Sequence, residues 1–257
     1  MLAIKRLGDQ MIGRFLKRRR TKQAARLPEG VRIYAIGDVH GRADLLDRLL
    51  ARIDTHVALN PIVRPILLFI GDYIDRGPAS RDVLDLLIKC AWVREAVFLK
   101  GNHETFIMNF LKNPQVLRDW SKIGGLETLM SYGLQPSIGA DETTQKELAK
   151  ALDSALPASH RQFLDSLVPS FSCGSYFFAH AGVRPGVPLS KQSEDDLLWI
   201  RDEFLLHEDD FGKIIVHGHT PVRELDIRPN RINIDTGAYV TGRLTCLMLE
   251  GDRAEPL

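Results

Sequence analysis

Residues 31–41, VRIYAIGDVHG, run from an apolar, β-rich segment into a polar turn. The six residues Val31 to Ile36 are apolar or β-forming apart from Arg32, and Gly37 bounds them. Such a run is typical of a buried strand. Asp38 and His40 follow it two positions apart, so an extended backbone places their side chains on the same side. A carboxylate and an imidazole in this arrangement can bind one cation.

Strands and helices alternate along the chain after this first strand. Amphipathic helices are predicted over residues 44–56 and 80–90, between the early strands. The alternation indicates an α/β fold built from βαβ units, and the Gly/Asp turns of the last part favour antiparallel additions. The other predicted strands are 66–70, 96–99, 176–179, 213–216, 231–234 and 243–249.

The chain is predicted to form one catalytic domain over residues 31–257, preceded by a basic arm at residues 1–30. Residues 105–170 are rich in helix-forming sequence and carry no clear strand signal, so a helical cap is expected there. The longest apolar run of the whole chain, residues 66–70, is too short to cross a bilayer. Three widely spaced cysteines favour a reducing compartment, and a cytoplasmic location is expected.

The basic arm differs in charge from the rest of the chain. Residues 1–30 contain nine lysines and arginines and two acidic residues, a net charge of +7, whereas the whole protein carries +1. Leucine, isoleucine and phenylalanine residues are interleaved, which is typical of a basic amphipathic helix. Contact with anionic lipid or nucleic acid is one interpretation, and a solvated arm without a partner is the other.

Five short polar motifs lie just beyond predicted strands. In an open α/β sheet the carboxyl ends of strands meet at one crevice, so loops distant in sequence deliver side chains to one site. The motifs are GDVHG at 37–41, GDYIDRG at 71–77, GNHE at 101–104, HAG at 180–182 and HGHT at 217–220.

Together these motifs offer six ligands of mixed nitrogen and oxygen type, enough for two ions about 3.5–4 Å apart in a two-metal hydrolase. The absence of cysteine argues against a structural zinc site and favours a pair of hard or borderline ions. Manganese is expected, with iron, zinc or cobalt as alternatives. Any one motif alone would be weak evidence. The candidate ligands are Asp38, His40, Asp72, Asn102, His180 and His219, with His217 as the alternative to His219.

Six residues outside the motifs receive a structural interpretation. His56, His160 and His207 are expected to be ordinary polar groups, and Cys90, Trp92 and Trp120 to pack in the core or between helices.

The patterns GDxHG, GDxxDRG and GNHE resemble the signatures of the PPP family of metallophosphatases, over about residues 31–249. The segment 199–201 and the ending NIDTG at 233–237 are similar to those of bacterial and phage protein phosphatases in this family. The resemblance implies a metallophosphoesterase-like αββα sandwich of mixed sheets with a helical cap. It also implies hydrolysis of phosphoserine or phosphothreonine by attack of a metal-bound hydroxide.

The resemblance further assigns roles to single residues. Asp38, His40 and His219 would bind the first ion, Asn102 and His180 the second, and Asp72 would bridge both. His103 would be the general acid that protonates the leaving oxygen, with Asp75 orienting its ring. Arg76 and Arg201 would hold phosphate oxygens, although Arg201 could instead pair with the nearby acids 195, 196 or 203.

Three other functions remain open. Activity toward phosphotyrosine is possible in addition. A symmetrical diadenosine tetraphosphate hydrolase of the same superfamily is the alternative enzyme, but such enzymes commonly lack an aspartate at the position of Asp75. A catalytically inactive binding module would be expected to have lost ligands, whereas all six and His103 are present.

The arm is not expected to take part in catalysis, because every motif lies after residue 30. Its removal should leave turnover of a small aryl phosphate nearly unchanged. Contact with lipid or nucleic acid would be detected as salt-sensitive binding that disappears with the arm.

Overall fold

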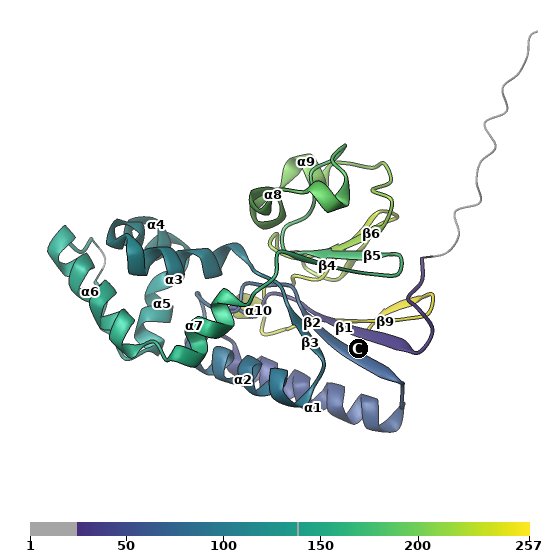
Figure 1. Cartoon of the computed structure of the whole chain (residues 1–257), viewed down its shortest axis with the longest axis horizontal. Helices are drawn as coiled ribbons and strands as arrows, with labels where there is room; N and C mark the ends of the chain where they lie inside the picture. The colour runs from purple at the N-terminus through teal and green to yellow at the C-terminus, as the bar shows by residue number, and fades with distance from the viewer. Residues whose placement is uncertain (1–24, 138) are drawn as a thin grey trace, which may run out of the picture.

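The computed structural model describes residues 25–137 and 139–257 as two five-stranded mixed sheets packed face to face, with helices outside both (Figure 1). The predicted αββα architecture is confirmed. Residues 1–24, which hold most of the basic arm, lie outside the described residues. No helix among the described residues is long and apolar enough to cross a membrane.

The first sheet contains the strands that precede the first three motifs. Its order is β10-β9-β1-β2-β3, with β1 parallel to β2, β2 parallel to β3, and β9 antiparallel to both β1 and β10. The strands are β1 (Val31–Ile36), β2 (Arg64–Phe69), β3 (Ala96–Phe98), β9 (Cys246–Glu250) and β10 (Arg253–Pro256).

The second sheet carries the last two motifs and has the order β4-β5-β6-β8-β7. β5, β6 and β8 are parallel, whereas β4 and β7 are antiparallel edge strands. The sequence did not predict these edge strands or β10. The strands are β4 (Ser170–Cys173), β5 (Tyr176–Ala179), β6 (Ile214–His217), β7 (Asp226–Ile227) and β8 (Arg231–Asn233).

Three apolar cores separate the four layers. Every residue of β1 is buried, because Tyr34 and Ile36 face the helices while Ile33 and Ala35 face the second sheet. Helices α1 (Ala43–Leu59) and α2 (Ser80–Val93) cover the outer face of the first sheet (Figure 1). Helices α8 (Glu194–Trp199) and α9 (Asp202–Leu205) cover the second sheet, and the short helix η3 (Leu189–Lys191) packs against the same core. The short helix α10 (Ala238–Thr241) lies beside the start of α1, where Arg42 donates to the carbonyl oxygen of Ala238 at 3.0 Å.

The helices between β3 and β4 extend beyond the sheets (Figure 1). α5 and α7 contact α2, and α6 contacts α3, so this group rests on the first helical layer. Its members are α3 (Asn102–Lys112), η1 (Pro114–Val116), α4 (Leu117–Trp120), η2 (Ser121–Ile123), α5 (Gly125–Ser131), α6 (Glu142–Ala155) and α7 (Ala158–Asp165).

The last part of the arm, residues 25–30, packs against the domain. Leu27 is buried, and its backbone N–H donates to the carbonyl oxygen of Gly251 at 2.8 Å. Gly174 lies directly against this segment. A deletion that spares the core should therefore stop at residue 24.

Trp92 was expected to pack in the core or between helices, and this expectation is wrong. Its side chain is 82% exposed, near the carboxyl end of α2. Cys90, two residues earlier on the same helix, is buried as expected. The helical pattern identified the apolar face correctly, but α2 continues for three residues beyond the predicted end at residue 90.

Leu84→Ala should lower the free energy of unfolding by about 2–5 kcal/mol, because it removes a fully buried side chain between α2 and the first sheet and leaves a cavity. Leu59→Ala, at the 76% exposed last residue of α1, is the matched control. Urea unfolding of both variants tests the assignment of this core, and equal losses would contradict it.

Candidate metal and catalytic site

The loops after five parallel strands bring the predicted ligands together. Asp38 and His40 follow β1, Asp72 follows β2, and Asn102 begins α3 after β3. His180 follows β5 and His219 follows β6 in the second sheet. All six side chains are buried. The crevice expected at the carboxyl ends of the strands therefore lies where both sheets meet.

The backbone at the site adopts a conformation that side chains normally avoid. Five non-glycine residues among the described residues have positive φ, between 45° and 72°, and all five are predicted site residues. Strained backbone of this kind persists only where the surrounding structure imposes it, and it clusters at functional sites. The five are His40, Asp72, Asp75, Arg76 and His219.

Asp72 lies between two groups of candidate ligands. One carboxylate oxygen, Oδ2, is 3.5 Å from Nε2 of His40 and 3.7 Å from Nε2 of His103. The other, Oδ1, is 3.4 Å from Nε2 of His180. Each oxygen therefore faces a different group, which is the arrangement that a bridging carboxylate needs. The two groups, His40–Asp72–His103 and Asp72–His180–His219, each have ligand atoms within 4.8 Å of one another.

The structure groups His219 differently from the sequence-based expectation, which placed it with Asp38 and His40. Nδ1 of His219 lies 2.9 Å from Oδ1 of Asn102 and 3.2 Å from Nε2 of His180. Only the backbone N–H of His219 approaches Asp38, donating to its Oδ2 at 3.0 Å. The ring therefore belongs to the Asn102–His180 group. Spacing along the chain could not show this, because β6 lies in the second sheet.

Asp38 provides a test of whether these residues suit cations. Its Oδ1 is buried and has no hydrogen-bond partner among the described residues. Burial first, and then the charges of Asp235 and Asp72, raise the pKa of Asp38 well above its usual range. A buried, unpaired carboxylate beside other carboxylates and neutral imidazoles is compensated by a bound cation. The donor set therefore fits divalent metal.

The charges of the imidazoles follow from the same burial. Burial lowers the pKa of His40 to about 3 and also lowers those of His180 and His219, so these rings are neutral and free to ligate. Burial alone would raise the pKa of Asp72, but His180, His103 and His40 outweigh it, and this carboxylate stays ionised.

His103 differs from the other imidazoles of the site. Burial disfavours its charged form, but Asp72 and Asp75 outweigh burial and raise its pKa. Nδ1 of His103 lies 2.6 Å from Oδ2 of Asp75, and Nε2 lies 3.3 Å from a guanidinium nitrogen of Arg76. The ring is therefore held by a carboxylate on one side and points toward the ligand cluster on the other.

The two predicted arginines act on different ligands, although both act on Asp235. The charge of Arg76 acts on Asp38 and His40, whereas that of Arg201 acts on His180 and His219. Arg201 is exposed, and its guanidinium donates to Oγ1 of Thr220 at 3.2 Å.

The acidic neighbours of Arg201 have another partner. Arg184 pairs with Asp196 and Glu203. Among the described residues Arg201 forms no ion pair with these two acids or with Asp195, and its role at the site stays a prediction.

Several residues at the site had been given no role. Asp235, from the NIDTG segment, is a further buried carboxylate whose pKa burial raises to about 6. The ring of Tyr239 lies under the Arg76 guanidinium at 4.7 Å and against His40 at 5.4 Å. Trp120 is buried as expected, but its indole N–H also donates to Asp75 at 2.8 Å. The NIDTG motif signalled Asp235; no sequence pattern pointed to Tyr239 or Trp120.

The remaining histidines do not join the ligand groups. His217 is buried with its ring against Phe204 at 4.8 Å, and burial lowers its pKa to about 3. His56 bonds the hydroxyl of Tyr34, and His160 lies between Tyr132 and Asp85. His207 packs on Phe211. The structural interpretation of His56, His160 and His207 therefore agrees with their surroundings.

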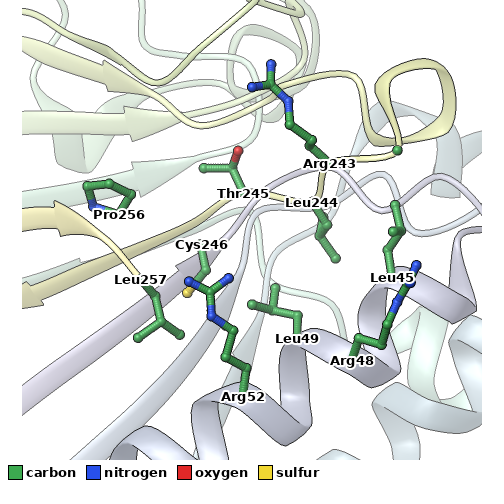
Figure 2. A pocket seen from close by; sticks show the side chains of 11 residues that line it. Leu45, Arg48, Leu49, Arg52, Arg243, Leu244, Thr245, Cys246, Pro256 and Leu257 are labelled. Atoms are coloured by element: carbon green, nitrogen blue, oxygen red, sulfur yellow. The ribbon is translucent and has the colours of Figure 1, made fainter.

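A surface cavity of about 360 Å³ lies between α1 and the edge formed by β9 and β10 (Figure 2). Leu49, Leu244 and Leu257 form part of its wall, and the side chains of Arg48 and Arg52 rise beside them (Figure 2). None of the ten predicted site residues lines it. This cavity is therefore separate from the candidate site.

Comparison with known proteins identifies a shared domain. The model of the calcineurin-like phosphoesterase family matches residues 31–247. The chain is 29% identical over 238 residues to the asymmetrical bis(5'-nucleosyl)-tetraphosphatase PrpE of Anoxybacillus flavithermus, covering 82% of this chain and 88% of that protein. It is 27% identical over 222 residues to serine/threonine-protein phosphatase 2 of Escherichia coli, covering 83% and 90%.

Among solved structures, one of a protein provisionally assigned as a diadenosine tetraphosphatase matches with a TM-score of 0.62 at 20% identity. The match covers 91% of this chain and 98% of that one, and it supports the fold.

Asp72→Asn should be the most damaging single change among the candidate ligands, because both groups share this carboxylate. We expect it to lower the amount of metal bound per chain, measured by elemental analysis after dialysis against manganese. Asp47→Asn, at an exposed position on α1, is the control. Full metal occupancy in Asp72→Asn would contradict the bridging assignment.

Proposed function

Because the chain belongs to the calcineurin-like phosphoesterase family, we propose that it is a protein phosphatase that hydrolyses phosphoserine and phosphothreonine. The observation that carries this proposal is the buried pair of His103 and Asp75, whose Nδ1 and Oδ2 atoms are 2.6 Å apart beside the ligand cluster. Chelation should abolish the activity, since the family is metal-dependent.

Two divalent cations would be held by the six candidate ligands, and manganese is the expected metal. These ligands are Asp38, His40, Asp72, Asn102, His180 and His219. Two such ions lower the pKa of water and neutralise phosphate charge. The charges of Arg76 and Arg201 both act on residues of the cluster, and their planar guanidinium groups suit paired bonds to phosphate oxygens. The protein groups thus orient the phosphate for in-line displacement.

His103 would supply the proton that the leaving group needs. With Nδ1–H directed at Asp75, the proton of the charged ring that can be transferred is on Nε2, which faces the cluster. A serine or threonine alkoxide is a poor leaving group, so its departure gains from a proton donor. A phosphate anion leaving from a phosphoanhydride needs less help, and this difference favours the phosphoester as substrate.

The cleft beside the site supports the same choice. A hollow of about 470 Å³ is bounded by Phe106 and Trp199, and the ring of Trp199 lies 6.2 Å from that of His219. Among its described lining residues Asp119, Glu194 and Asp195 are acidic and none is basic, although Lys122 and Lys100 pair with the first two. Such a cleft favours a peptide over a polyphosphate.

Hydrolysis of dinucleoside tetraphosphates is the second candidate, because the PrpE relative carries that name. Its name specifies asymmetrical cleavage, whereas the sequence-based alternative was symmetrical. The two reactions give different products from diadenosine tetraphosphate: AMP with ATP, or two ADP molecules.

A panel of three substrates distinguishes these functions. The purified full chain with manganese should hydrolyse a phosphoserine peptide and p-nitrophenyl phosphate with kcat/KM well above that for diadenosine tetraphosphate. The reverse order, with AMP and ATP as products, would establish the second candidate instead.

His103→Ala should slow hydrolysis of the phosphoserine peptide much more than that of p-nitrophenyl phosphate, because nitrophenolate leaves readily without a proton. General acid catalysis contributes about 10²- to 10⁴-fold, which bounds the expected loss on the peptide. Asp75→Asn should give the same asymmetry in weaker form. Equal losses on both substrates with metal retained would show that His103 acts otherwise, and loss of metal would make it a ligand.

A further inference from the structure

The carboxylate of Asp75 is surrounded by donors from the helical group between β3 and β4. Oδ1 accepts a hydrogen bond from the hydroxyl of Thr128 at 2.5 Å, and Oδ2 accepts one from the indole N–H of Trp120 at 2.8 Å. The side chains of Asp75, Trp120 and Thr128 are all fully buried. Trp120 ends α4 and Thr128 lies in α5, so both donors come from outside the loop that carries Asp75.

We propose that Trp120 and Thr128 are positioning residues for the reaction: they fix the Asp75 carboxylate so that Oδ2 holds His103 with Nε2 directed at the leaving oxygen. This inference rests on the proposed function, in which His103 donates the proton. It assigns the helical group a part in proton transfer.

The directions of the hydrogen bonds around Asp75 follow from the number of hydrogens that each group can donate. The single hydrogen of the Thr128 hydroxyl goes to the carboxylate, so the Ser80 hydroxyl, 3.0 Å from Thr128 Oγ1, donates to Thr128. The backbone N–H of Asp75 then donates to the oxygens of Ser80 and Thr128, at 3.0 and 2.9 Å. Every donor in the cluster is used, and the Asp75 carboxylate accepts hydrogen bonds from Thr128, Trp120 and His103.

Packing also fixes the Trp120 donor. The Trp120 ring packs on Phe110 of α3, the helix whose first turn carries His103. Gly125 lies so close to that ring that an added Cβ would approach it to 2.4 Å. The backbone N–H of Arg76 donates to the carbonyl oxygen of Gly124 at 3.1 Å. The indole therefore cannot move without displacing α3 or the turn before α5.

Asp75 needs this external support because its own backbone is strained. Its φ is 72°, and that of Arg76 is 68°. A non-glycine residue in this region relaxes unless its neighbours hold it. Without the two donors, both carboxylate oxygens could rotate, and Nδ1 of His103 would lose a fixed partner.

Three substitutions test the role of these donors. Thr128→Val removes the hydroxyl and keeps the shape, Thr128→Ser keeps the hydroxyl, and Trp120→Phe removes the N–H. Tyr132→Phe is the control, because it deletes another buried hydroxyl at the end of α5, whose partner is His160 at 2.7 Å and which does not contact Asp75.

Each full-length variant is assayed with manganese on a phosphoserine peptide and on p-nitrophenyl phosphate, with bound metal and the midpoint of thermal unfolding measured in parallel. Thr128→Val and Trp120→Phe should lower kcat on the peptide about 10- to 100-fold, the scale of a misplaced catalytic group. KM, metal content and kcat on the aryl phosphate should change little. Thr128→Ser should restore most of the loss, and Tyr132→Phe should keep wild-type kcat on both substrates.

Equal losses on the two substrates in Thr128→Val, or a peptide-specific loss in Tyr132→Phe, would overturn the inference. If Trp120→Phe does not fold, the comparison of Thr128→Val with Thr128→Ser decides the matter. A wild-type protein that hydrolyses neither substrate would instead overturn the proposed function, so the two failures are distinguishable.

Discussion

The buried carboxylate of Glu104 is the interaction on which the geometry of the site depends. It accepts hydrogen bonds from the backbone N–H groups of Gly101 at 2.9 Å, Asp72 at 3.0 Å and Tyr73 at 2.8 Å. These residues belong to the loops after β2 and β3, so one side chain ties the two loops together. Val39 and His40 join the loop after β1 to the same unit by donating to the carbonyl oxygen of Asp72. The positive φ angles of His40 and Asp72 are imposed by this network.

The same packing brings acidic groups closer together than a stable core would normally allow. Three aspartates, Asp38, Asp72 and Asp235, are buried close together. Their negative charges repel one another, which disfavours the ionised form of Asp38 and Asp235. Glycines permit the crowding: a Cβ on Gly218 would lie 2.1 Å from Asp38, and one on Gly101 would lie 2.2 Å from Asp72. The three apolar cores supply the stability that the site lacks, and bound cations would relieve the repulsion.

In the proposed reaction, the helical group between β3 and β4 links the candidate metal-binding region to proton transfer. Asp75 stands at the contact between the two, with its loop on β2 and its hydrogen-bond donors on α4 and α5. In that reaction, two different groups of residues would orient the reacting groups: the strand-end loops would orient the metal ligands, and the helices would orient Asp75, the hydrogen-bond partner of His103. A change in the helices can alter the chemistry without touching a ligand.

The sequence by itself determined the fold class, the ends of β1 and β5, and the identity of the residues that meet at the crevice, because strand periodicity and strand-end motifs are local patterns. It could not determine that His219 lies with Asn102 and His180, since that depends on how the second sheet packs on the first. The edge strands β4, β7 and β10 were missed for a related reason, because short strands are defined by their partners. Trp120 has the sequence context of an ordinary core residue, and only the tertiary fold directs its N–H at a carboxylate 45 residues away. Local patterns specify which groups are present, whereas packing of distant segments specifies which atoms they face.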